Sequence, residues 1–112
     1  MEKEKILYTE STNDGQSIFL FYDQMVGVYV AYGLSAYYVT MVTEPYLSYS
    51  EEMSMPVALL SKGHLKYMRG GNLTMLQHIP KTFYHFQMRY HVGDAGYVKW
   101  LKRNFPGLPD ID

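Results

Sequence analysis

Positively charged side chains dominate one part of the chain, where they alternate with aromatic residues. Residues 57–105 carry eight Lys or Arg and one acid, a balance of +7, whereas residues 1–56 carry two bases and eight acids, a balance of −6. Basic side chains can hold a phosphate backbone, and aromatic rings can stack on bases. The candidate polyanion-binding residues are Lys62, Lys66, Arg69, Arg89, Lys99, Lys102 and Arg103.

The same basic residues have a plainer interpretation, because the solvent-facing side of a helix must be polar whatever its sign. The acidic first half of the chain can also neutralise the second half after folding. The sequence pI of about 6.4 lies well below the value typical of dedicated nucleic-acid-binding domains. Nucleic-acid or polyanion binding is therefore our second functional hypothesis.

Groups suited to catalysis are sparse. His91 and Asp94 could act as an acid–base pair if a folded cleft brought them together. The segment 93–96 could offer backbone N–H groups to an anion at a helix start, although a turn and a cap explain the same residues. We find no glycine-rich phosphate loop and no nucleophile elbow. A small enzyme with an aromatic pocket is our third hypothesis, and we predict no catalytic residue.

Metal and thiol chemistry have little support. The chain has no cysteine, which excludes disulfides, thiol catalysis and cysteine-ligated metal sites. His85 and His91 face the same way along a predicted strand, but they lie about 20 Å apart on it. His64 and His78 have no further ligand at a suitable spacing. We therefore predict neither a metal nor a cofactor.

One uncharged stretch needs to be tested as a membrane span. Residues 24–43 contain no charge, and this length is sufficient for a spanning helix. The Tyr, Thr, Ser and Gly residues in it are too polar for hydrocarbon, and Gly33 and Ser35 divide it into two runs of strand length. No apolar run follows the charged N-terminus, so we expect no signal peptide. We predict a cytoplasmic domain that does not contact a membrane.

Length and composition predict a single α+β domain over residues 1–112, in which residues 107–112 form a loose tail. Tyrosine accounts for 12 of the 112 residues, and aromatic side chains favour strands. Asn13-Asp14-Gly15 is typical of a turn. We expect an antiparallel meander of about four strands, over 5–10, 17–23, 26–32 and 35–43, followed by a helix, two more strands over 73–79 and 81–92, and a C-terminal helix packed on the sheet.

The first predicted helix follows an irregular segment over 44–55. It begins at Ser54-Met55-Pro56, extends to residue 69 with three of the basic residues on its exposed side, and ends at Gly70-Gly71. A hairpin that turns at Lys62-Gly63 is the alternative, because glycine weakens the interior of a helix.

The C-terminal helix has clearer signals. Asp94 is predicted to cap its N-terminus, and Pro106-Gly107 ends it. The side of this helix that we expect to face the core is formed by Tyr97, Val98, Leu101 and Phe105.

Three of the predicted strands, over 17–23, 26–32 and 35–43, are apolar or aromatic on both faces. Two helices cannot cover all of such a sheet, and exposed aromatic sheet surface marks an interface. Our leading hypothesis is therefore a non-enzymatic module that acts through protein–protein contact. We expect a homodimer that pairs through a sheet face or a strand edge.

Overall fold

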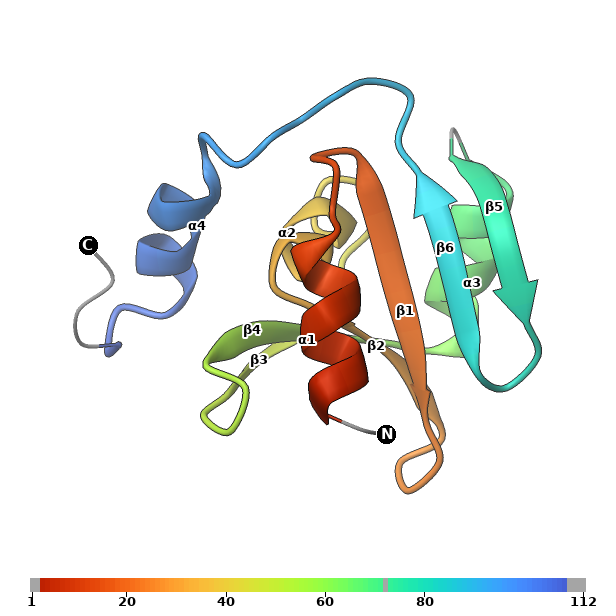
Figure 1. The fold of residues 1–112 in the computed structure, drawn as a ribbon, viewed down its shortest axis with the longest axis horizontal. Helices are drawn as coiled ribbons and strands as arrows, with labels where there is room; N and C mark the ends of the chain where they lie inside the picture. Colours follow the sequence, from red (N-terminus) through yellow and green to blue (C-terminus); the bar gives the residue numbers. More distant parts are fainter. Residues whose placement is uncertain (1–2, 72, 109–112) are drawn as a thin grey trace.

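One antiparallel sheet of six strands organises the α+β fold, and helices pack on both of its faces (Figure 1). The structure is a computed structural model that describes residues 3–71 and 73–108. The elements in chain order are α1 (Lys3–Ser11), β1 (Ser17–Asp23), β2 (Val28–Tyr32), α2 (Leu34–Val39), β3 (Tyr46–Ser50), β4 (Met55–Leu60), α3 (Lys62–Arg69), β5 (Thr74–Ile79), β6 (Phe83–Gln87) and α4 (Tyr97–Asn104).

The sheet order is β3-β4-β2-β1-β6-β5. β1 lies inside the sheet, and its first five residues are buried, as expected for a strand that is apolar on both faces. Leu20 of β1 pairs with Ala31 of β2 on one side and with Tyr84 of β6 on the other. Because the sheet has a right-handed twist, β3 and β4 run in a very different direction from β6 and β5 (Figure 1).

Alternation along β1 builds a separate core on each face of the sheet. Ile18 and Leu20 contribute to the larger core, which also contains buried side chains of α2, α3 and α4. Phe19 and Phe21 face the other way and pack with Ile6 of α1. The helix α1 therefore covers one face, and the other three helices pack against the opposite core.

The first predicted strand, over 5–10, is wrong, because these residues belong to α1. Ile6 and Glu10 are four residues apart and are the two buried residues of that helix. The segment is short, and its Lys and Glu residues are good helix formers. Helical spacing therefore describes it better than alternation does.

The strand predicted over 35–43 is also wrong, because α2 occupies Leu34–Val39. Gly33 has a φ of 59°, a backbone conformation that glycine adopts readily and that turns the chain out of β2. Ala36, Tyr38 and Val39 of α2 are fully buried in the larger core. Tertiary packing thus overrides the strand propensity of these aromatic and branched residues.

The expected start of the first helix needs a correction as well. Ser54-Met55-Pro56 leads into β4, whose burial alternates along Met55–Leu60, and the segment predicted as irregular contains β3. The helix itself is confirmed over the hairpin alternative, but it begins after Ser61, whose side chain accepts the backbone N–H of His64. Four strands do precede this helix, although β2 pairs with β4 and not with β3.

The last third of the chain follows the prediction more closely. β5 and β6 lie within the expected ranges, and Tyr84 and Phe86 of β6 are buried. The connection 88–96 then runs past the end of the sheet at which β1 begins and leads to α4 (Figure 1). Asp94 is not the cap of α4, because Gly96 holds that position without a side-chain hydrogen bond. The residue of α4 that is buried is Trp100, whereas Val98 is 44% exposed. Residues 109–112 of the predicted loose tail lie outside the described residues.

Candidate functional site

The most exposed strand of the sheet is β5, which lies at one end of the strand order. It pairs with β6, and no other strand in the described part of the chain pairs with its outer edge. All six of its residues are exposed, whereas β3 at the opposite end has two exposed residues in five. We call the outer side of β5 the β5 edge.

The side chains on β5 are apolar or neutral. Met75, Leu76 and Ile79 are 45%, 50% and 42% exposed, and the strand contains no charged residue and no proline. Natural proteins usually protect an edge strand with charges, prolines, bulges or a covering segment. A bulge between Met75 and Gln77 is the one such device that β5 carries among the described residues.

Pairing with β6 defines which way the β5 side chains face, because directly paired residues share a face of the sheet. Met75 pairs with Phe86, and His78 pairs with Tyr84, so both lie on the side of the larger core. The imidazole of His78 stacks on the ring of Tyr84, with centroids 4.1 Å apart and an interplanar angle of 4°. Ile79 pairs with Phe83 and therefore faces the side that α1 covers.

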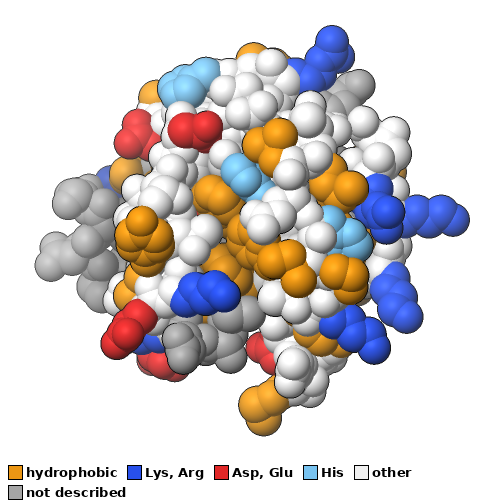
Figure 2. Space-filling model, turned by 45° about the vertical axis from the view of Figure 1, so that its right-hand side comes forward, with side chains coloured by type: hydrophobic (Ala, Val, Ile, Leu, Met, Phe, Trp, Pro, Cys, Tyr) orange, Lys and Arg blue, Asp and Glu red, His pale blue; other side chains and the backbone are white. Residues whose placement is uncertain are grey.

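Helix α3 runs behind β5 and β6 (Figure 1) and carries three cations, Lys62, Lys66 and Arg69. A cavity of about 400 Å³, which we call the α3 groove, lies between this helix and the sheet. Its lining consists of Lys62, Leu65, Lys66, Arg69 and Tyr84. Lys and Arg side chains gather along the right-hand margin of Figure 2, beside hydrophobic ones.

The sequence-predicted basic set does not form a single surface. The three cations of α3 share the α3 groove, but α4 lies at the opposite end of the long axis of the molecule (Figure 1). Arg89 is exposed in the segment that follows β6. The exposed residues of α4 in this set are Lys99, Lys102 and Arg103.

The proposed acid–base pair has no support from the geometry. His91 and Asp94 are both exposed, and no hydrogen bond joins them in the part of the chain that the structure describes. The imidazole of His91 lies instead against Gly15, where a Cβ atom would come within 2.5 Å of its Nε2. Gly15 in turn accepts the backbone N–H groups of Val92 and Gly93 through its carbonyl oxygen.

A different Asp, Ser and His are in contact, and the sequence did not point to them. The Ser17 hydroxyl donates to Oδ1 of Asp14 at 2.9 Å, and Nε2 of His85 lies 2.9 Å from the same hydroxyl oxygen. While the Ser17 hydroxyl donates its only hydrogen to Asp14, it can only accept from the imidazole, and in this arrangement His85 is not a base toward the serine. Burial lowers the pKa of His85, and Ser17 is buried, so the trio joins β1 to β6 rather than forming a nucleophile.

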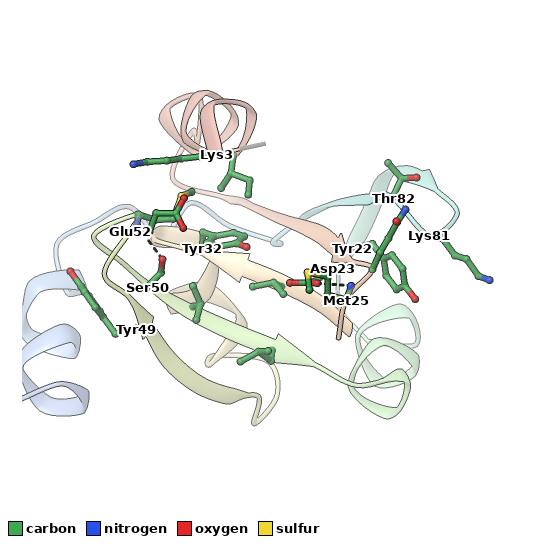
Figure 3. A pocket seen from close by; sticks show the side chains of 16 residues that line it. Lys3, Tyr22, Asp23, Met25, Tyr32, Tyr49, Ser50, Glu52, Lys81 and Thr82 are labelled. Carbon is green, nitrogen blue, oxygen red and sulfur yellow. Dashed lines mark hydrogen bonds between the residues drawn. The ribbon is translucent and has the colours of Figure 1, made fainter. Parts of the chain in front are cut away.

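An open groove of about 660 Å³, larger than the α3 groove, lies on the face that carries α1 (Figure 3). Its floor includes Val57 and Leu59 of β4 and Val30 of β2. Charges of both signs surround it, with Lys3 and Glu52 toward one end and Asp23 toward the other (Figure 3). An apolar floor with a mixed rim can hold a side chain or a small molecule, but it presents no nucleophile paired with a base in the described residues.

Glu10 is a second residue that sequence reasoning missed. It is 7% exposed, and burial raises its pKa to about 7. Its Oε2 accepts the Ser35 hydroxyl at 2.6 Å, and its Oε1 accepts the Ser35 backbone N–H at 3.2 Å. A small cavity of about 240 Å³ adjoins it, lined also by Gly33 and Tyr97. Both carboxylate oxygens are engaged at the start of α2, so Glu10 holds α1 and α2 together.

Comparison with protein-family models, with curated proteins and with solved structures gave no match to this chain. Within the described residues, no helix is long and apolar enough to cross a membrane. The same residues contain no group of three His, Asp or Glu side chains that could hold a metal ion. Function must therefore be argued from the geometry of this chain alone.

Proposed function

We propose that this domain is a non-enzymatic interaction module that binds another protein chain through the β5 edge. The observation that supports this proposal is the exposure of all six residues of an edge strand that contains no charge and no proline and has no strand on its outer side in the described part of the chain. A strand edge offers a row of backbone N–H and C=O groups, and an extended partner segment can pair with them as an added strand. The cytoplasmic location expected from the sequence belongs to the same proposal, and the absence of cysteine supports it.

The apolar residues of the strand supply a second reason. Met75, Leu76 and Ile79 expose 42–50% of their surface without a covering element in the described residues. Side chains alternate along a strand, so an added segment would contact apolar groups on both faces of the sheet. Main-chain hydrogen bonds would then provide affinity, and these side chains would provide selectivity.

A selection experiment with random unstructured peptides displayed on phage tests the proposal. We expect the selected peptides to protect the amides of β5 from hydrogen exchange. Leu76→Lys should abolish their binding, because a lysine on an edge strand opposes the addition of another strand. Val98→Lys is the matched control, since it places the same charge at an exposed apolar position of α4. Selected peptides that bind the Leu76→Lys variant unchanged would contradict the proposal.

Polyanion binding is the second candidate function, supported by the position of Lys62, Lys66 and Arg69 around one groove. Three cations are a smaller set than the sequence predicted, because those of α4 lie at the other end of the molecule. Oligonucleotide binding that weakens steeply with salt would support this function, because each phosphate contact releases a counterion.

A further inference from the structure

We propose that the β5 edge takes up an acidic, extended segment of another protein, whose carboxylates meet Lys62, Lys66 and Arg69 across the α3 groove. This inference rests on the proposed function and adds the chemistry of the partner. It is carried by three cations that line a groove together with Tyr84 of β6, the strand that pairs with the open edge strand β5.

Tyr84 of β6 connects the α3 groove with β5. Tyr84 lines the groove, and its pairing partner on β5 is His78, which stacks on it. Met75 lies on the same face of β5 as His78. A strand added beyond β5 would therefore direct every second side chain toward the side on which α3 lies.

The cations of α3 have no acidic partner within the described chain. Lys62, Lys66 and Arg69 are all exposed, and none forms an ion pair with a described carboxylate. Lys66 and Arg69 lie in the last turn of the helix, where positive charge stabilises the helix dipole. Lys62 is the first residue of α3, at the end where the dipole disfavours a cation. Helix stability therefore does not explain the complete set, whereas an anionic partner does.

The pattern of a fitting segment follows from the two faces of β5. The face toward α3 combines the three cations with Leu65 and Tyr84, so it suits acidic side chains. The other face carries Thr74, Gln77 and Ile79, which pair with Gln87, His85 and Phe83, so it suits uncharged side chains, including apolar ones. Side chains of a strand point alternately to the two faces. The expected segment thus alternates acidic and apolar residues over about five or six positions, the usual length of a strand.

A second copy of β5 fits this surface less well than an acidic segment does. β5 itself contains no acid. Symmetric antiparallel pairing of two β5 edges keeps the same face of both sheets on one side. Each α3 would then bring Lys62, Lys66 and Arg69 to that side, and like charges would oppose the association.

Peptide is also a better match than nucleic acid. The β5 edge offers backbone hydrogen-bonding groups and three exposed apolar side chains, those of Met75, Leu76 and Ile79. The backbone of a peptide can pair with these N–H and C=O groups while its side chains cover the apolar ones. A phosphate backbone can accept from the N–H groups but cannot donate to the C=O groups or cover apolar side chains.

Fluorescence anisotropy with labelled peptides tests the inference. The probe is a peptide of alternating Glu and Val, and the comparison peptides replace Glu by Lys or by Gln. We expect the Glu peptide to bind at least tenfold more tightly than the other two at low salt. We also expect this preference to shrink as salt screens the charges.

Two charge-matched variants locate the binding site. Lys62→Glu with Lys66→Glu should weaken binding of the Glu peptide about tenfold or more, because two attractions become repulsions. Lys99→Glu with Arg103→Glu makes the same change in charge on α4 and should leave the affinity unchanged. Equal losses in both double variants would overturn the inference in favour of a general effect of net charge.

The remaining outcomes separate this inference from the proposed function. If all three peptides bind equally and Leu76→Lys abolishes their binding, the β5 edge binds peptide but the acidic partner is wrong. If a single-stranded oligonucleotide binds the α3 groove and the Glu peptide does not, the inference is overturned and the second candidate function gains support. If no peptide binds even at millimolar concentration, both proposals fail.

Discussion

At the scale of single residues, the most informative group is the carboxylate of Glu10. It is buried between α1 and the start of α2, where it accepts two hydrogen bonds from Ser35. Burial disfavours the charged form more strongly than these hydrogen bonds favour it, so the pKa rises from 4.5 to about 7. In the sequence, Glu10 is one acid among eleven, and nothing local distinguishes it.

The raised pKa of Glu10 predicts how stability depends on pH. Between pH 4.5 and about 7 the folded state holds a proton that the unfolded state has lost, so the free energy of unfolding falls as pH rises through this range. The full loss is about 3 kcal/mol, because each unit of pKa shift corresponds to roughly 1.4 kcal/mol. Urea unfolding at a series of pH values measures it.

Glu10→Gln should remove most of this dependence, because the amide keeps the shape of the side chain without a titrating group. Glu4→Gln serves as control, since Glu4 is an exposed acid of the same helix and its replacement should leave the slope in place. A slope that persists unchanged in the Glu10→Gln variant would assign the pH dependence to another group.

At the scale of elements, the sequence correctly predicted the strands whose alternation of apolar and polar residues can be seen within the strand itself. The predicted range of β1 agrees with the structure, and the alternation of β6 correctly separates buried from partly exposed residues. The helices α1 and α2 were predicted as strands, because their actual conformation depends on contacts with residues that are distant in the sequence. Ser35 of α2 accepts the backbone N–H of Phe19 and donates to Glu10, and neither contact can be seen in the run 35–43.

Helix α4 shows what the spacing of apolar residues can and cannot predict. The sequence correctly predicted this helix but assigned the wrong side of it to the core, because Trp100 was not among the residues expected to be buried. The ring centroid of Trp100 lies 5.3 Å from that of Tyr37 in α2 and 6.1 Å from that of Phe105. A wide aromatic ring can reach the core from a position that the apolar stripe alone would exclude.

Trp100→Ala should therefore destabilise the protein by about 3–5 kcal/mol, the usual cost of truncating a buried aromatic side chain. Lys99→Ala, at the neighbouring exposed position, should change stability by less than about 0.5 kcal/mol. Leu101→Ala should fall between them, because Leu101 is half-buried. Thermal unfolding of the three variants checks the order, and equal effects would mean that α4 contributes little to the core.

At the scale of the whole molecule, the fold class follows from composition, but the order of strands does not. The two strands beside β1 are β2 and β6. Ser17 of β1 pairs with Gln87 of β6, although most of the chain lies between them in sequence. No local pattern specifies such a pairing, so neither the exposure of β5 nor the separation of α3 from α4 could be predicted. For the same reason, the sequence assigned more cations to one surface than the structure brings together.

The homodimer expected from the sequence stays a prediction, and the position of α3 sharpens it. If two copies pair through β5, their basic residues meet, so we expect a mass near 13.1 kDa at low salt and a rise toward twice that value as salt screens the repulsion. Light scattering over a range of protein and salt concentrations measures this mass. A dimer that is most stable at low salt would contradict pairing through this edge and indicate another surface.

The central place of β1 also has a consequence for how the chain acquires its fold. β1 can pair early with β2, since a short turn joins them, but its other edge stays open until β6 arrives some seventy residues later. Contacts this distant in sequence form late, because the loop between them must close first. During synthesis, Ile18, Phe19 and Phe21 would meanwhile border an unpaired edge, so the nascent chain should aggregate most readily before residue 87 leaves the ribosome.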